Sequence, residues 1–106
     1  MRLCIKYGDQ NDSLQAQFPV VGEARGPFSA LRGEQQWYVL QLSRPFEHEA
    51  NLYGQLLVAS RWIGRTVAEA GTSVFVLGVP DAAGGITDGF DVEAFPKLVW
   101  GLTDDV

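Results

Sequence analysis

Residues 73–79 read Ser-Val-Phe-Val-Leu-Gly-Val and are apolar on both faces of an extended chain. A second run of this kind, Gln-Trp-Tyr-Val-Leu-Gln-Leu, lies at residues 36–42. A strand that is wet on one side alternates apolar with polar side chains, whereas a strand covered on both sides does not. The two runs therefore predict central strands of a β-sheet. Their second face needs a cover, and the sequence leaves three alternatives open: another sheet, a helix or a second copy of the chain.

Shorter strands are predicted before these central runs. Residues 2–7 alternate between apolar and polar side chains, and so do residues 14–21. Pro19 lies inside the second run and lacks a backbone N–H, which predicts an edge strand or a bulge. A further short strand is expected around residues 28–31, beyond the Gly-Pro pair at 26–27.

The C-terminal run 98–102 completes the series, with Leu98, Trp100 and Leu102 expected on one face. Strand-like runs that recur about every 8–12 residues are typical of small all-β folds. The sequence therefore predicts a mainly β fold, namely a small antiparallel barrel, roll or sandwich of about 6–8 strands.

The segment from residue 45 to residue 63 is open to two interpretations. A helix fits because Ser43 supplies an N-cap and Pro45 suits the first turn. Against the helix, Gly54 lies in its interior, where glycine costs about 1 kcal/mol relative to alanine. We favour a strand over residues 53–62. The alternative is an α+β fold with one helix in 45–63 packed on the sheet.

Size and charge define the broad class of protein. With 106 residues, 46% of them hydrophobic, we expect one globular domain over residues 1–106. A net charge of −5 argues against nucleic acid as a partner, because phosphates need a concentrated basic surface. Residues 1–7 lack the apolar core of a signal peptide, and no apolar run is long enough for a membrane span. Together with the single cysteine, Cys4, these features predict a cytoplasmic protein without a membrane partner.

His48 is the catalytic candidate that the sequence offers, because it is the one histidine and lies between Glu47 and Glu49. Neighbours on a strand point to opposite faces, so both carboxylates do not readily share a site with the imidazole. The sequence contains no Gly-x-Ser-x-Gly, His-Glu-x-x-His or Cys-x-x-Cys motif. The pattern favours a polar surface turn at His48 and, while leaving enzymatic activity open, a non-enzymatic protein without a cofactor.

Residues 80–95 form an acidic, glycine-containing stretch. Asp88, Asp91 and Glu93 are its metal-ligand candidates, but their spacing is not that of an EF-hand loop. A solvated connection is therefore favoured over a metal site. Because long connections in compact domains are sometimes functional, we expect a binding lip or lid here.

Five aromatic residues on the predicted strands are the binding-site candidates. They are Trp37, Tyr38, Tyr53, Trp62 and Trp100. Core packing, an aromatic-lined cavity and a protein interface each fit these residue types. We expect a non-enzymatic binding or protein-interaction domain that self-associates as a homodimer, the second copy covering the apolar face. The alternative is a small-molecule-binding domain or small enzyme, with an aromatic-lined pocket and the 80–95 loop as its lid.

Overall fold

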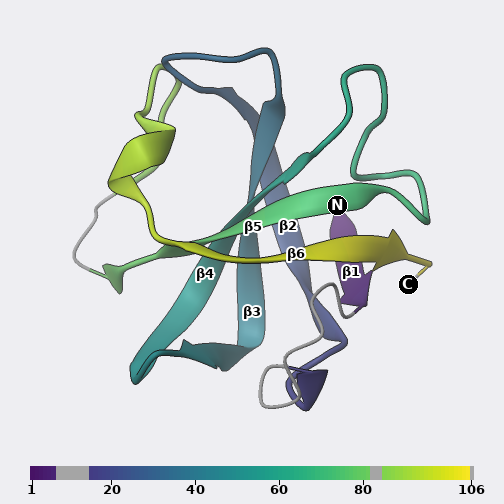
Figure 1. The fold of residues 1–106 in the computed structure, drawn as a ribbon, viewed down its shortest axis with the longest axis vertical. Coiled ribbons are helices and arrows are strands. Elements are labelled where there is room, and N and C mark those ends of the chain that lie inside the picture. The colour runs from purple at the N-terminus through teal and green to yellow at the C-terminus, as the bar shows by residue number, and fades with distance from the viewer. Residues whose placement is uncertain (7–14, 82–84, 106) are drawn as a thin grey trace.

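The computed structural model describes residues 1–6, 15–81 and 85–105, and its strands form a closed antiparallel barrel (Figure 1). The strands are β1 (Arg2–Lys6), β2 (Val20–Ser29), β3 (Gln36–His48), β4 (Asn51–Ser60), β5 (Ser73–Val79) and β6 (Lys97–Asp104). Each strand pairs with the next along the chain, and β6 pairs with β1 to close the barrel. The prediction of a mainly β fold with a small antiparallel barrel is confirmed.

The segment 45–63 contains a strand pair, and the alternative with a helix in this segment is wrong. β3 and β4 are joined by a tight turn at Glu49 and Ala50, and they pair in antiparallel register. Phe46 and Tyr53 pair across this hairpin and face the barrel interior, whereas Leu57 faces outward. Phe46, Tyr53 and Leu57, which would lie on one side of a helix, thus lie on two faces of the sheet. Among the described residues, no helix has the length and apolarity needed to cross a bilayer.

β2 differs from the predicted strands at both ends. Of the predicted strand 14–21, residue 14 lies outside the described residues, residues 15–19 form a turn and bend, and the strand begins only at Val20. Pro19 therefore lies before the first paired residue of β2, so its missing N–H costs no hydrogen bond between strands. At its other end β2 continues through Gly26, where a shift of register against β3 forms a bulge. The expected strand 28–31 is the end of β2.

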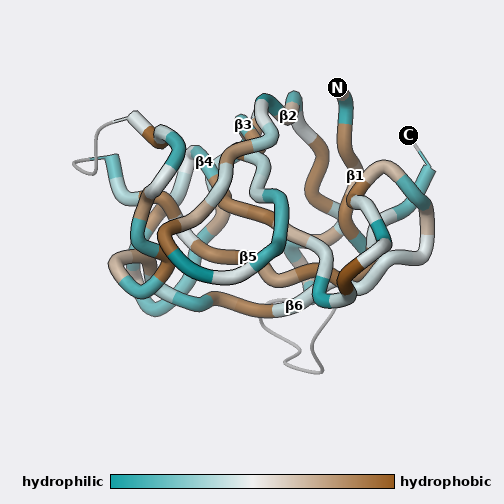
Figure 2. Tube along the Cα trace, turned by 90° about the horizontal axis from the view of Figure 1, so that it is seen from above, coloured by the Kyte–Doolittle hydropathy of each residue, from teal (hydrophilic) through white to brown (hydrophobic). Residues whose placement is uncertain are grey.

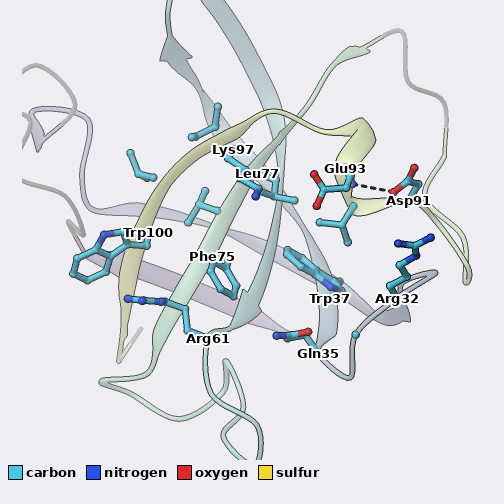
Figure 3. A pocket seen from close by; sticks show the side chains of 15 residues that line it. Arg32, Gln35, Trp37, Arg61, Phe75, Leu77, Asp91, Glu93, Lys97 and Trp100 are labelled. Atoms are coloured by element: carbon cyan, nitrogen blue, oxygen red, sulfur yellow. Dashed lines mark hydrogen bonds between the residues drawn. The ribbon is translucent and has the colours of Figure 1, made fainter.

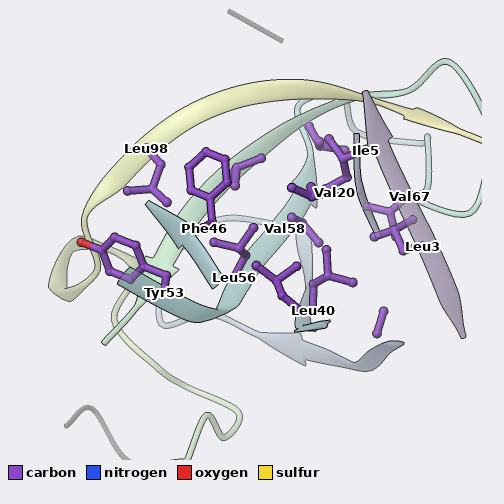
Figure 4. Close-up of a cluster of buried hydrophobic side chains, with 14 residues drawn as sticks. Leu3, Ile5, Val20, Leu40, Phe46, Tyr53, Leu56, Val58, Val67 and Leu98 are labelled. Carbon is purple, nitrogen blue, oxygen red and sulfur yellow. The ribbon is translucent and has the colours of Figure 1, made fainter. Parts of the chain in front are cut away.

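Side chains fill the barrel interior (Figure 4). Phe46, Leu40 and Leu56 are at most 1% exposed, as expected for a small barrel whose inward positions pack against each other. The connection between β4 and β5 closes one end by inserting Val67 into this core. Thr103 holds that connection in place, because its hydroxyl donates to the Glu69 carbonyl and accepts the Thr72 N–H.

The outer face of β3, β4 and β5 carries a second apolar cluster, and part of the chain itself covers it. Leu57 and Leu77 are buried there beneath Ile86, Phe90 and further apolar residues of the stretch 86–95. This covering segment, as we call residues 86–95, includes the short 3-10 helix η2 (Val92–Ala94). Figure 2 shows how hydrophobic residues concentrate along the strands, while several connections are hydrophilic.

Hydrogen bonds tie the covering segment to the end of β2. The Ser29 N–H donates to Asp88 Oδ1 over 2.9 Å, and the Gly89 N–H donates to the Ser29 carbonyl over 2.7 Å. Two residues beyond Ser29, the Leu31 N–H donates to the Phe90 carbonyl over 2.7 Å. The doubly apolar strands need a cover on their second face. Over this part of the outer face, the chain's own covering segment supplies it.

Candidate functional site

The covering segment stops part of the way along β5. Leu77 and Val79, which point outward beneath it, are each 3% exposed. Phe75 is the next outward-pointing residue of the same strand, and it is 37% exposed. The same apolar face is thus buried at one end of β5 and open at the other.

A bulge in β6 places a second aromatic side chain beside Phe75. Val76 pairs with Val99 but Leu77 pairs with Lys97, so Leu98 is an extra residue in β6. The bulge turns Leu98 into the barrel core and leaves Lys97 and Trp100 on the outer face. Trp100 lies directly across from Phe75 and is 41% exposed.

A groove of about 590 Å³ lies where the covering segment ends, and we call it the outer groove (Figure 3). Its lining includes Trp37, Phe75, Trp100, Arg61, Arg32 and Lys97. Figure 3 shows Trp100 and Arg61 at one end and Arg32 and Asp91 at the other. Asp91, Val92 and Glu93 contribute a wall, so the stretch expected as a binding lip does border this groove.

Arg61 is held against three aromatic rings at its end of the groove. Its guanidinium carbon lies 5.2 Å from the ring centroid of Trp100 and 5.7 Å from those of Phe75 and Trp62. Its backbone N–H donates to the Ser73 carbonyl over 2.8 Å, which fixes the start of the side chain. A guanidinium stacked on rings keeps N–H donors at its edge available for an anionic group.

The basic residues that line the groove have no ion-pair partner among the described residues. Arg2, Lys6 and Arg65 each lie within 4 Å of a carboxylate oxygen. Arg32, Arg61 and Lys97 form no ion pair with the described residues, and the same holds for Arg25 and Arg44 outside the groove. Three of the eight basic residues of an acidic protein therefore gather at one groove without a carboxylate partner in the described part of the chain.

The acidic residues of the covering segment are partly engaged within the chain. Asp91 caps η2, since its Oδ1 accepts the Glu93 N–H over 3.0 Å. Asp88 binds the N–H and the hydroxyl of Ser29. Across residues 1–6, 15–81 and 85–105, no three His, Cys, Asp or Glu residues form a group suited to a metal ion. The three metal-ligand candidates of the sequence thus serve as local caps, ties and wall residues.

The five aromatic candidates fall in three places. Trp37 and Trp100 line the outer groove. Tyr38 and Trp62 line a neighbouring pocket of about 350 Å³ next to the connection between β4 and β5. Tyr53 is buried in the barrel interior, where its ring packs against Gly78 of β5. The structure therefore brings two of the five into one groove.

His48 and Cys4 lie elsewhere on the barrel. His48 is the last residue of β3 and pairs with Asn51 across the turn, where Gln17 holds the neighbouring backbone of Glu47. Cys4 is buried in β1, and burial together with the nearby Asp104 carboxylate raises the pKa of its thiol. Neither residue borders the outer groove.

Phe75 and Lys97 had no separate signal in the sequence, and Arg61 had only a weak one. Phe75 stands in a run that predicts burial on both faces, so its exposure depends on where the cover ends. Lys97 is aimed outward by the bulge, which alternation cannot reveal. Arg61 next to Trp62 is a local basic and aromatic pair, but its contact with Trp100 depends on the pairing of β5 with β6.

Comparison of the chain with protein-family models, curated proteins and solved structures gave no significant match.

Proposed function

We propose that the protein is a non-enzymatic binding domain that holds a segment of a partner protein in its outer groove. The observation that carries this proposal is the exposure of Phe75 and Trp100 side by side, on a face whose other half is buried by the chain itself. When a partner covers exposed apolar surface of this kind, the burial of that surface stabilises the complex.

The residue types of the groove support a protein partner. Tryptophan and arginine are enriched among the interface residues that contribute most to binding, and phenylalanine is enriched in interfaces generally. The groove is only partly enclosed, so a small ligand would keep part of its surface in water. A polypeptide segment, in contrast, covers an open groove with part of its surface and continues beyond it.

A closed barrel constrains how such a segment binds. β-strand addition needs an unpaired strand edge, and both edges of β5 are paired with β4 and β6. Side chains of the groove therefore supply the recognition. The cytoplasm remains the compartment that this proposal assumes, since the buried Cys4 thiol gives no reason for an oxidising one.

A random-peptide library displayed on phage tests the proposal, because it presents many different segments to the groove at once. We expect the wild-type protein to enrich peptides that bind Trp100→Ser about thirtyfold more weakly, the effect of losing a residue worth about 2 kcal/mol. Leu52→Ser is the matched control, because Leu52 is a large exposed apolar residue of β4 outside the groove. The proposal is wrong when no peptide is enriched, or when Trp100→Ser binds the enriched peptides as tightly as Leu52→Ser does.

Self-association is a second candidate function, supported by a different observation. Trp62 and Ile63 are consecutive residues after β4 and are 57% and 76% exposed. Ser60 fixes this corner, because its hydroxyl accepts the Trp62 N–H and donates to the Trp62 carbonyl. We expect sedimentation equilibrium to detect a dimer that Trp62→Ser weakens. A molecular mass that stays monomeric at all accessible concentrations excludes this candidate.

A further inference from the structure

We propose that the occupant of the outer groove is an acidic segment with an aromatic side chain, supplied by a partner protein. This inference rests on the proposed binding function and adds the chemistry of the ligand. It combines two independent observations, namely the kind of segment that already lies on this face and the charges left without partners beside it.

The chain's own covering segment shows what the outer face accepts. Residues 87–95 read Thr-Asp-Gly-Phe-Asp-Val-Glu-Ala-Phe and combine three carboxylates with two phenylalanines. The Phe90 ring meets Trp37 edge to face at a centroid distance of 6.1 Å and Phe95 at 6.0 Å. Its apolar side chains pack on the sheet, while Asp91 and Glu93 stay exposed. The same face therefore binds an acidic and aromatic segment in cis.

The uncovered half of the face repeats the aromatic surface on which this segment packs. Trp37 contacts both halves, because its ring meets Phe90 on the covered side and stacks on Phe75 at a centroid distance of 6.4 Å. An incoming aromatic ring finds Phe75 and Trp100 there, at the spacing of paired strands. The groove adds a set of cations that have no ion-pair partner among the described residues.

These cations favour carboxylates on the ligand. Arg61 lies over both exposed rings, and Lys97 also lines the groove. Asp91 and Glu93 also line the groove, but both lie away from the end that holds Arg61 (Figure 3), so an acidic group near Arg61 is not placed against either of them. The net charge of −5 repels an acidic ligand only weakly at physiological salt, where screening acts over about 8 Å.

Two other occupants fit the groove less well. Single-stranded nucleic acid also combines stacking with arginine, but its binding relies on many phosphate contacts, and only three basic residues of the described chain line this groove. A second copy of the chain, related by a two-fold axis through the groove, would place one concave surface against another. Such a pair leaves a void where an interface needs packed side chains.

Titration of isotope-labelled wild-type protein with two synthetic peptides tests the inference by NMR. One peptide copies residues 87–95, and the other replaces its three carboxylates as Asp88→Asn, Asp91→Asn and Glu93→Gln. We expect the acidic peptide to shift the resonances of Phe75 and Trp100 and to bind about tenfold more tightly than the neutral one. That factor corresponds to three exposed ion pairs of about 0.5 kcal/mol each. Added salt is expected to remove most of the difference.

Substitutions on the protein separate the role of charge from the role of shape. Arg61→Met keeps an apolar stem against the rings, and we expect it to weaken the acidic peptide about threefold and to leave the neutral peptide unchanged. Arg44→Met is the matched control, since Arg44 is exposed on β3 outside the groove and is expected to change neither affinity.

The outcomes distinguish this inference from the function on which it rests. Equal binding of both peptides, or library peptides that need Trp100 but are neutral or basic, overturns the acidic ligand and leaves the binding domain standing. Shifts confined to Leu57 and Val79 show displacement of the covering segment, which also overturns it. Tighter binding of a labelled oligothymidine at Trp100 overturns it in favour of nucleic acid. Absence of any peptide that depends on the groove removes the proposed function as well.

Discussion

The two halves of the outer face of the barrel share the strand β5 and differ in whether their side chains are buried or exposed. Leu77 and Val79 lie under the covering segment, while Phe75, two residues before Leu77 on β5, lies open beside Trp100. Both halves are apolar in sequence. The difference arises from where one connection crosses the sheet, and it separates residues that stabilise the fold from residues that are available to a partner.

This contrast gives the apolar residues of β5 different expected roles. Burial of a large apolar side chain stabilises the folded state by about 1.5–3 kcal/mol, whereas an exposed one contributes less. The covered half is therefore expected to respond to substitution through stability, and the groove through binding.

The largest expected effect is in the covered half. Leu57→Ala removes a fully buried side chain beneath the covering segment and should lower the free energy of unfolding by about 2–5 kcal/mol. Urea denaturation followed by circular dichroism measures the change. A loss below about 1 kcal/mol would mean that the covering segment does not pack on Leu57.

The second largest effect is expected in the covering segment itself. Phe90→Ala removes the half-buried ring that contacts Trp37, and we expect a loss of about 2 kcal/mol in the free energy of unfolding. Trp37 then gains access to water, so its fluorescence should shift to longer wavelength. Unchanged emission together with unchanged stability would contradict the contact that defines the boundary between the two halves.

A smaller effect is expected where the cover is tied to β2. Asp88→Asn weakens a charge-assisted bond to the Ser29 N–H at an exposed site, and we expect a loss of about 1 kcal/mol. Urea denaturation of Asp88→Asn is compared with that of Asp105→Asn. The second variant is the control, because Asp105 is exposed outside the groove and the covering segment. Equal stability of the two variants would show that Asp88 does not anchor the segment.

Cys4 provides a measure of the barrel that is independent of both halves. Burial, assisted by Asp104, raises the pKa of its thiol, so the unfolded state loses this proton first as pH rises. The stabilisation by Cys4 is therefore complete below the ordinary thiol pKa of about 8.5 and falls as pH rises toward the folded value. Urea midpoints measured against pH should decline more steeply for wild type than for Cys4→Ala. Parallel curves would contradict the burial of the thiol.

The sequence predicts the class of fold well and the site only in part. Alternation and doubly apolar runs identify the strands and the β class, because these patterns depend on local side-chain direction. They place Leu98 and Trp100 on one face, yet the β6 bulge sends Leu98 inward and Trp100 outward. A bulge depends on the pairing of distant strands and leaves no local pattern here.

The local sequence pattern does not predict the path of the covering segment either. Residues 80–95 draw attention as a long acidic stretch, but the path of residues 86–95 depends on bonds such as that between Ser29 and Asp88, which are 59 positions apart. Without that path, exposed Phe75 and buried Leu77 cannot be told apart. Whether the second face requires another copy of the chain could not be decided from composition either, because an internal segment satisfies the same need.

The most direct test of the account measures stability and binding together in Phe75→Ser. The free energy of unfolding comes from urea denaturation, and the affinity comes from titration with the peptides selected on the wild-type protein. We predict a loss of about 1–2 kcal/mol in stability, below that expected for Leu57→Ala, and a loss of about tenfold in affinity. Destabilisation as large as that of Leu57→Ala, or peptide affinity equal to that of the wild type, would contradict the division of the outer face into a structural half and a binding half.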